Sequence, residues 1–432
     1  MAGDVNVCLI TPGQVGSNPR VVKEARALHD AGLRVVVIAT QVLDSVEMRD
    51  QAILRDAPYR IERIDLRGKQ KWRLRRIGQI AAGALAASCG IDRLSARAFS
   101  PFTPALVAAA LRVRADLYIA HYPPALPAAV AAARRYGARF AFDAEDFHLG
   151  DWPEDSAHDA QRLRLRALEA SALKQCAYVT AASPGIADAY AETYRIVRPR
   201  VVLNAFSLAQ AAPGPTPRGS AEPGPSVYWF SQVVGPDRGL ECAVQAIGRA
   251  RTRPHLYLRG DLAEGFSQML HRIAADAGAA GRVHLLPAEA PDQMEKLASA
   301  YDVGLCSEPG HTRNNDLALS NKLFSYLAAG IPPLMSNTTG QRDFAKTCGL
   351  DDLLYPIGDA GALALLFDRM LGDPARLAEA RARAWRLARE RYNWEMQRGA
   401  LIEAVTRALQ PGDTAAPAAD AIARDSVRAL TR

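Results

Sequence analysis

The sequence lacks paired cysteines, long hydrophobic segments and two common nucleotide-binding motifs. Its six cysteines include no Cys-x-x-Cys pair, a pattern typical of free thiols in a reducing compartment. The most apolar helical segment, residues 77–89, is too short and too rich in alanine to span a bilayer. The first residues enter a strand-like run directly, so we expect no signal peptide and a cytoplasmic protein. Neither a GxGxxG nor a Walker A motif is present, which disfavours nicotinamide and flavin cofactors.

The composition indicates a globular protein of about two domains. The chain has 432 residues, of which 49% are hydrophobic, and domains commonly span about 100–200 residues. A formal net charge of +7 is compatible with an anionic substrate or an acidic surface. Aromatic residues make up only 7% and the basic residues are dispersed, so we expect no nucleic-acid partner.

Apolar strand-like runs alternate with amphipathic helical patterns along most of the chain. In the first half the expected strands are residues 5–11, 34–39, 61–66, 117–120, 139–143, 178–182 and 201–203. In the second half they are residues 227–230, 256–259, 283–286, 303–306 and 331–335. Nearly continuous apolar strands separated by helices predict parallel sheets covered on both faces, which is an α/β fold.

A stretch rich in proline and glycine divides this pattern into two similar units. Residues 207–225 hold five prolines and three glycines without an apolar period, which predicts a linker. We therefore expect an N-terminal domain over residues 1–206 and a C-terminal domain over residues 226–373, facing each other across a cleft. Helices over residues 374–410 are expected to pack back on the N-terminal domain, and residues 411–432 to form a loose tail.

The loop after the first expected strand is suited to contact a ligand. Gly13 and Gly16 allow a tight turn and a close approach of the backbone to another molecule. We interpret residues 11–20 as a substrate-contacting loop, and an ordinary turn between a strand and a helix is the alternative.

A second loop starts at Glu308 and leads into Ser320, Asn321 and Lys322. Ser320 is suited to cap the next helix, since its side-chain oxygen can accept a hydrogen bond from an unpaired backbone N–H. A helix start carries a partial positive charge, and Lys322 adds a full positive charge in the first turn. This combination predicts an anion site, and a diphosphate is the expected anion.

Several segments together resemble the retaining glycosyltransferases of family 4, which have the GT-B fold. These segments are PRVVKEARALHDAGLRVVVIAT, ADLYIAHYPPALPAAVAAARRYGARFAFDAEDFH, YVTAASPGIADAY with VVLNA, SNKLFSYLAAGIP and RYNWE. The resemblance implies two Rossmann-like domains, with a nucleotide-diphosphate sugar in the C-terminal domain and a glycan or lipid-linked acceptor held mainly by the N-terminal domain. It also implies retention of the anomeric configuration, no cofactor, no obligatory metal, and a role in cell-surface polysaccharide or glycolipid synthesis.

The resemblance assigns expected roles to individual residues. The candidate donor-binding residues are Gly13, Gly16, Arg238, Glu308, Asn321, Lys322 and Ser325. The candidate acceptor-binding residues are Asn18, Arg20 and His121, with a structural role as the alternative for the histidine. The candidate catalytic residues are Glu145, Asp146, Arg238 and Lys322. No residue is expected to bind a metal.

The chain departs from the family at two donor-binding positions. The family glutamate that grips the ribose falls on Ser325, and its companion acid falls on Leu317, for which Glu308 is expected to substitute. The family also places a Gly-Arg and then a Lys-Gly after the first strand of the C-terminal domain. Gln232 stands at the position of that arginine and Arg238 at the position of that lysine. Because an arginine can bind phosphate with two parallel hydrogen bonds, we expect Arg238 to contact the diphosphate.

A third departure follows the expected strand over residues 139–143. Many relatives have a histidine near the transferred sugar where this chain has Glu145. A carboxylate there is suited to stabilise positive charge at the anomeric carbon or to accept a hydrogen bond from the acceptor. The next residue, Asp146, has helix capping as its alternative role, and His148 is expected to be structural.

Six cations and no acid lie between Arg67 and Arg76, together with Trp72. Such a segment can contact anionic lipid at the inner membrane face, which fits a lipid-linked acceptor. A solvated loop and helix face is the alternative.

Other functions stay open at this point. A nucleotide-sugar epimerase and a phosphorylase share the two-domain plan, although the sequence has no evident lysine site for pyridoxal phosphate. A non-catalytic glycosyltransferase-like subunit is compatible with the altered residues Ser325, Gln232 and Glu145.

Overall fold

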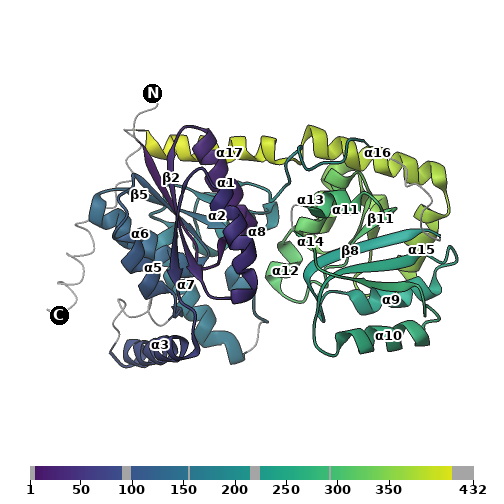
Figure 1. Cartoon of the computed structure of the whole chain (residues 1–432), viewed down its shortest axis with the longest axis horizontal. Coiled ribbons are helices and arrows are strands. Elements are labelled where there is room, and N and C mark those ends of the chain that lie inside the picture. Colours follow the sequence, from purple (N-terminus) through teal and green to yellow (C-terminus); the bar gives the residue numbers. More distant parts are fainter. Residues whose placement is uncertain (1–4, 90–98, 154–155, 215–223, 291–292, 411–432) are drawn as a thin grey trace.

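Two α/β domains lie side by side, and two long C-terminal helices run along both of them (Figure 1). This computed structural model describes the chain except for residues 1–4, 90–98, 154–155, 215–223, 291–292 and 411–432. The expected tail over residues 411–432 and part of the expected linker lie outside the described residues.

The N-terminal domain contains a seven-stranded parallel sheet in the order β3-β2-β1-β4-β5-β6-β7. Its strands are β1 (Asn6–Ile10), β2 (Arg34–Gln41), β3 (Arg60–Asp65), β4 (Leu117–His121), β5 (Arg139–Ala144), β6 (Val179–Ala181) and β7 (Arg200–Val201). The chain builds outward from β1 to β3 and then returns to the other side of β1 with β4. In sheets of this kind, ligands commonly bind at the carboxyl ends of the strands beside such a reversal, which here lies between β1 and β4.

Helices cover both faces of this sheet. They are α1 (Pro19–Asp30), α2 (Glu47–Asp56), α3 (Lys69–Cys89), α5 (Thr103–Ala110), α6 (Leu126–Tyr136), α7 (Asp159–Leu173) and α8 (Pro184–Tyr194). Successive residues of β1 alternate between the two faces, as expected for an extended strand. Val7 and Leu9 pack in a core with α1, whereas Cys8 and Ile10 pack in a second core with α5, α6 and α8.

The C-terminal domain repeats this plan with a six-stranded parallel sheet in the order β10-β9-β8-β11-β12-β13. Its strands are β8 (Ser226–Val234), β9 (His255–Leu262), β10 (Val283–Leu286), β11 (Val303–Cys306), β12 (Pro333–Ser336) and β13 (Leu354–Tyr355). Its helices are α9 (Leu240–Arg249), α10 (Phe266–Asp276), α11 (Met294–Ala298), α12 (Arg313–Leu317), α13 (Asn321–Ala329), α14 (Thr339–Cys348) and α15 (Ala360–Leu371). The reversal of strand order lies here between β8 and β11.

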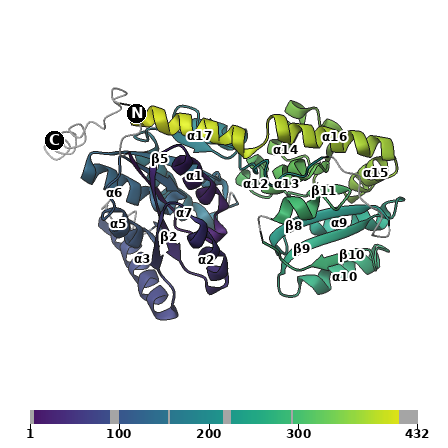
Figure 2. The same cartoon turned by 45° about the horizontal axis from the view of Figure 1, so that its top comes forward.

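The last two described helices connect the domains (Figure 2). Helix α16 (Pro374–Glu390) packs on the core of the C-terminal domain. Helix α17 (Trp394–Leu409) instead adds Trp394, Leu401 and Val405 to a core of the N-terminal domain. The side chain of Gln397 also accepts a hydrogen bond from the Leu203 backbone at 3.0 Å. Of residues 374–410, which were expected to pack back on the N-terminal domain, only helix α17 therefore does so.

Helix α12 of the C-terminal domain contacts the N-terminal domain directly. The Asn314 side chain accepts a hydrogen bond from the backbone N–H of Phe147 and donates one to Asp146, at 2.8 and 3.0 Å. The Ser183 hydroxyl donates to the carbonyl of Leu317 at 2.8 Å. These contacts hold the carboxyl end of β5 close to α12.

The expected strands and the α/β class are confirmed. Each of the twelve expected runs contains or overlaps an observed strand, but the two-residue strand β13 was not expected. Within the described part of the chain, no helix combines the length and apolar character needed to cross a membrane.

Candidate functional site

The N-terminal half of the candidate site lies at the carboxyl ends of β1, β4 and β5. The register of the parallel strands places His121 opposite Asp143, and Asp143 opposite Thr180. Side chains at paired positions of adjacent strands share one face of the sheet. A row of polar side chains therefore crosses three strands beside the point where the strand order reverses.

Glu145 directly follows β5, and three donors hold its carboxylate. Asn18 donates to Oε1 at 3.3 Å and Tyr122 donates to Oε2 at 3.1 Å, while the Nδ1 atom of His121 lies 3.3 Å from Oε1. The side chain is only 11% exposed. Fixed donors around a partly exposed carboxylate limit its motion, as an electrostatic role in a reaction requires.

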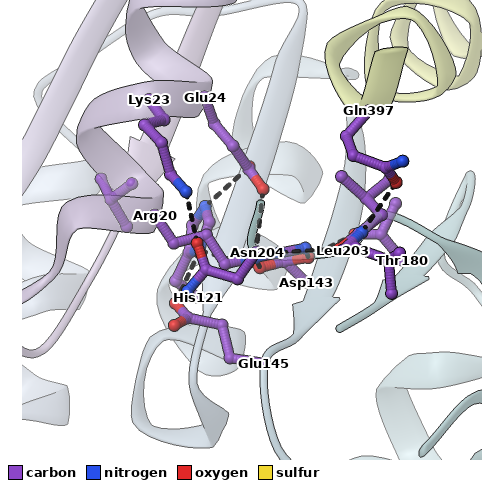
Figure 3. Close-up of polar contacts among 12 residues, drawn as sticks. Arg20, Lys23, Glu24, His121, Asp143, Glu145, Thr180, Leu203, Asn204 and Gln397 are labelled. Carbon is purple, nitrogen blue, oxygen red and sulfur yellow. Dashed lines mark hydrogen bonds and ion pairs between the residues drawn. The ribbon is translucent and has the colours of Figure 1, made fainter. Parts of the chain in front are cut away.

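Asp143 and Arg20 form a buried ion pair close to Glu145 (Figure 3). The Arg20 guanidinium donates two hydrogen bonds to the Asp143 carboxylate at 2.6 and 2.7 Å and a third to the Val202 carbonyl at 2.8 Å. Thr180 adds a donor to the same carboxylate. Burial alone would raise the pKa of Asp143, but Arg20 lowers it well below its ordinary value. Asp143 is therefore a fixed anion.

His121 lies between carboxylates of three residues. Its Nδ1 atom is 3.3 Å from both Asp143 and Glu145, and its Nε2 atom is 3.3 Å from Glu24. Burial alone would lower the pKa of His121, but the charge of Glu24 and the hydrogen bonds to all three carboxylates raise it well above the ordinary value. Burial and the charge of Asp143 in turn raise the pKa of Glu24. His121 is thus a buried imidazolium that helps to hold Glu145.

The structure buries Asn18, Arg20 and His121, the residues expected to contact the acceptor. All three are buried, with Arg20 only 1% exposed and its guanidinium fully engaged with protein atoms. Asn18 caps α1 by accepting from the Val21 backbone and reaches Glu145 with its amide nitrogen. Their polar groups are used within the domain and help to position Glu145, and a direct contact with an acceptor stays a prediction.

The two glycines of the first loop have different surroundings. The N–H of Gly16 donates to buried Asp50, and a side chain at this glycine would place its Cβ 2.8 Å from that carboxylate. Gly16 therefore has a packing role, and its expected donor contact stays a prediction. Gly13 is half-buried, and a Cβ atom added to it would lie 3.6 Å from the nearest other atom. A donor contact by Gly13 stays a prediction.

Asp146 joins the two domains through its hydrogen bond from Asn314. Its expected catalytic role stays a prediction beside this contact. His148 is buried, and its Nδ1 atom lies 3.1 Å from Asp151, in keeping with the expected structural role.

Lys23 connects α1 to the segment that leads into the C-terminal domain. Its ammonium group donates to Asn204 and to the carbonyl of Ala205, and lies 5.1 Å from the ring centroids of Phe206 and Trp394. Burial first, and then the charge of Arg20, lowers the pKa of Lys23 to about 7. This contact between α1 and the segment that joins the domains was not expected from the sequence.

Glu24, His121 and Asp143 are a possible metal-ligand set by distance alone. One ligand atom from each lies within 4.8 Å of the others, and all three residues are buried. However, the Nε atom of Arg20 is 2.6 Å from Asp143 and 3.3 Å from Glu24. The guanidinium already supplies a cation to these carboxylates, so a second cation would face strong repulsion. The donor set fits an ion-pair network better than a metal site.

The C-terminal half of the candidate site lies at the start of α13. The Ser320 side chain accepts from the Lys322 backbone and caps the helix, as expected. Gly304 in β11 lets this helix pack closely, since a Cβ there would be 2.3 Å from the ring of Tyr326. Asn321 is exposed at the helix start. The N–H groups of Lys322 and Leu323 are paired with Ser320, and the partial positive charge of the helix start is exposed at Asn321.

Lys322 and Glu308 form an ion pair at this helix start, with 2.8 Å between Nζ and Oε1. Burial alone would raise the pKa of Glu308, but Lys322 and a hydrogen bond from Ser320 lower it. The Lys322 ammonium group also lies 5.3 Å from the Trp229 ring centroid. An anion bound at the start of α13 would either share the Lys322 ammonium group with Glu308 or replace Glu308 as its partner.

Arg238 lies in the loop after β8 with its side chain exposed. The Ser307 hydroxyl donates to the Arg238 carbonyl at 2.7 Å, which ties this loop to the end of β11. Gly239 has φ +69, and a Cβ there would be 2.4 Å from the Ser307 carbonyl, so only glycine allows this approach. The exposed guanidinium is thereby held near Glu308, whose pKa it helps to lower. Gln232 is exposed in the same region.

The expected ribose contact of Ser325 stays a prediction, but the side chain has another partner. Its side chain is fully buried and donates to Glu295 of α11 at 2.7 Å. The hydroxyl is therefore used in helix packing. Leu317 lies at the domain contact described above, so an acid is absent from both positions of the family pair.

Some residues of the site were missed by sequence analysis. Glu24 follows Arg20 by four residues, which places both on one face of a helix. This spacing could have predicted their contact from the sequence. Tyr122 comes at the end of the expected strand over residues 117–120. Thr180 and Asn314 gave no local signal, because only the strand register and the domain contact bring them to the site.

Comparison with known proteins relates the N-terminal domain to a family. Residues 15–205 match the family described as Glycosyl transferase 4-like domain. A comparison with curated protein sequences gives no significant match.

Solved structures share the fold over nearly the full length of the chain. HepE from Anabaena, in complex with UDP and glucose, has a TM-score of 0.67 at 15% identity, covering 93% of this chain and 99% of that one. Sucrose-phosphate synthase from Thermosynechococcus elongatus has a TM-score of 0.69 at 15% identity, with 93% and 98% covered. A glycosyltransferase from Rickettsia africae has a TM-score of 0.66 at 14% identity, with 95% and 100% covered. The expected GT-B fold is therefore confirmed.

Proposed function

We propose that the protein transfers a sugar from a nucleotide-diphosphate donor to a glycan or lipid-linked acceptor, with retention of the anomeric configuration. Glu145 carries the proposal. It is a carboxylate held by Asn18, His121 and Tyr122 at the carboxyl end of the N-terminal sheet. The family match of this domain and the presence of UDP with HepE support a nucleotide-sugar donor.

The C-terminal domain would hold the diphosphate of the donor. Breaking the bond between sugar and phosphate leaves additional negative charge on the diphosphate. The exposed Arg238 guanidinium, Lys322 and the start of α13 at Asn321 are suited to stabilise this charge. Glu308, which now pairs with Lys322, would then contact the donor sugar. We propose that these cations make a metal unnecessary.

The reaction would take place on one face of the sugar. The departing phosphate would help to deprotonate the acceptor hydroxyl, and the new bond would form on the side from which the diphosphate leaves. Glu145 would stabilise positive charge at the anomeric carbon or orient the acceptor hydroxyl. A role in cell-surface polysaccharide or glycolipid synthesis fits this chemistry.

Calorimetric titration with UDP, GDP, ADP and TDP, first in EDTA and then with magnesium, tests the donor site. We expect one nucleotide to bind without metal, and Arg238→Ala and Lys322→Ala to lose binding and turnover while staying folded. Arg251→Ala is a matched control, since this arginine is exposed on another part of the domain. Full turnover in both site variants would refute the proposal.

We propose that helix α3 contacts an anionic membrane, at the cytoplasmic face where such a donor is available. Its exposed face carries Leu74, Ile77 and Ile80, which are 71%, 62% and 62% exposed, beside exposed Arg73 and Arg76. Exposed aliphatic residues next to arginines are typical of helices at a membrane surface. Arg67 contributes less than expected, because Asp44 and Asp65 pair with it.

Cosedimentation with vesicles tests this contact. Replacing Leu74, Ile77 and Ile80 by serine should abolish binding to vesicles that contain anionic lipid. Leu365→Ser removes an equally exposed leucine from the C-terminal domain and should have no effect. Equal binding to anionic and zwitterionic vesicles would contradict the proposal.

A further inference from the structure

A cleft of about 760 Å³ lies between the two domains. The N-terminal domain contributes the loop after β5, the first turns of α7 and the end of α8, and the C-terminal domain contributes the loop before α12. The side chains that matter most for its chemistry are Phe147, Trp152, Arg162, Arg166, Arg195 and Arg313.

This cleft adjoins both halves of the candidate site. Phe147, which lines it, is the second residue after Glu145. His311 lines the opposite wall, and its Nε2 atom is 3.8 Å from the carboxylate of Asp237, the neighbour of Arg238. The lining of the cleft therefore continues into the loop of the carboxylate on one side and contacts the loop proposed to hold the diphosphate on the other.

The charges that line the cleft are mostly positive. Its four arginines face only two carboxylates, those of Asp159 and Glu192. Arg162 pairs with Asp159, and Arg313 lies 3.6 Å from Glu192.

Two cationic side chains remain available for a ligand. Arg166 and Arg195 are exposed, and within the described part of the chain neither has an ion-pair partner. Guanidinium groups that lack a protein partner and line a concave site are well suited to bind phosphate or carboxylate.

Arg195 also occupies an unusual backbone conformation. It ends α8 with φ 51 and ψ 50, in the left-handed region where glycine is the usual residue. A residue with a side chain is unfavourable there, so the stability of the helix end does not explain an arginine at this position. The side chain lines the cleft, which gives it a reason to be present.

We propose that this cleft binds the acceptor through a phosphate or carboxylate group on its sugar. Arg166 and Arg195 bind the anion, and the half-buried Trp152 offers an aromatic surface to the sugar ring. The inference rests on the proposed glycosyl transfer, and it specifies that the acceptor of this reaction is an acidic glycan.

Calorimetric titration of the full chain with three sugars tests the proposal. Glucose 6-phosphate and glucuronate represent the two anionic groups, and glucose is the neutral comparison. We expect at least one acidic sugar to bind about tenfold or more tightly than glucose, and its affinity to fall as the salt concentration rises. Whichever acidic sugar binds better identifies the group that the cleft recognises.

Variants separate this binding from the stability of the fold. Arg166→Gln and Arg195→Gly should each weaken binding of the acidic sugar by about tenfold or more. Arg195→Gly should also leave the Tm unchanged or raise it, because glycine suits the left-handed conformation. Arg164→Gln is the matched control, since this exposed arginine lies on the same helix but does not line the cleft.

Nucleotide titration of the same proteins distinguishes the two proposals. Unchanged nucleotide binding in the Arg166 and Arg195 variants is expected. Equal affinity for glucose and both acidic sugars, no binding of either acidic sugar, or wild-type affinity in both variants would overturn the acidic acceptor. Failure of the wild type to bind any nucleotide would instead count against the proposed donor.

Discussion

Tyr122 donates a hydrogen bond to the Glu145 carboxylate at 3.1 Å from a backbone with φ 64 and ψ 148. This region is rarely occupied by residues other than glycine and costs of order 1–3 kcal/mol. The unfavourable backbone conformation at the end of β4 therefore coincides with a contact to the principal candidate catalytic group. Such a combination is typical of residues that are retained for a functional reason.

Tyr122→Phe should reduce turnover by about 10- to 100-fold, because a hydrogen bond to a charged group contributes about 1.5–3 kcal/mol. The variant keeps the ring and its packing against His148, so the Tm should change little. Steady-state kinetics and thermal unfolding check both points. Tyr136→Phe removes a comparable hydrogen bond far along α6 and should leave turnover unchanged.

Glu145→Gln should abolish measurable turnover, because the side chain keeps its shape but loses its charge. Asp146→Asn should retain more activity, since its carboxylate contacts Asn314 of the other domain. Comparing kcat and KM of the two variants tests the distinction. Equal losses in kcat would show that both acids take part in the reaction.

Arg20→Met should lower the free energy of unfolding by about 3–5 kcal/mol, because it leaves the buried carboxylate of Asp143 without its partner. Urea unfolding measures this change. The exposed pair of Arg198 and Asp188 provides the control, and Arg198→Met should cost less than about 1 kcal/mol. Similar losses in the two variants would contradict the buried network.

Stability should fall at alkaline pH because His121 is a buried imidazolium. Its pKa is raised in the folded chain, so its contribution is complete below about 6.5, the ordinary pKa in the unfolded chain. The contribution is lost as the pH rises through the folded pKa. Tm values of the wild type and His121→Asn between pH 6 and 10 test this, and the comparison cancels other titrating groups such as Lys23. If the Tm of both proteins changed with pH in the same way, a buried imidazolium at His121 would be ruled out.

Ser325→Ala should lower the free energy of unfolding by about 1–3 kcal/mol without changing nucleotide affinity. The substitution removes the hydroxyl that donates to buried Glu295. Urea unfolding and nucleotide titration measure the two effects separately. Weaker nucleotide binding at unchanged stability would instead support the ribose contact expected from the sequence.

Local patterns predicted the elements of the fold and the helix cap at Ser320. The apolar runs gave nearly all strands because the order of apolar residues in a buried strand is a property of a few neighbouring positions. The cap at Ser320 was predictable for the same reason, since it depends on residues within one helical turn. Strand β13 was missed because two residues, Leu354 and Tyr355, carry too little periodicity.

The sequence by itself determined that Arg20, His121, Asp143 and Glu145 end strands or begin helices near a cleft. Only the tertiary structure decided which of them are buried and which approach the surface. The register of β4 against β5 sets His121 beside Asp143, and α1 then places Arg20 under both. Burial depends on such contacts between segments far apart in the chain, whereas a sequence pattern reports only the preferences of residues close together.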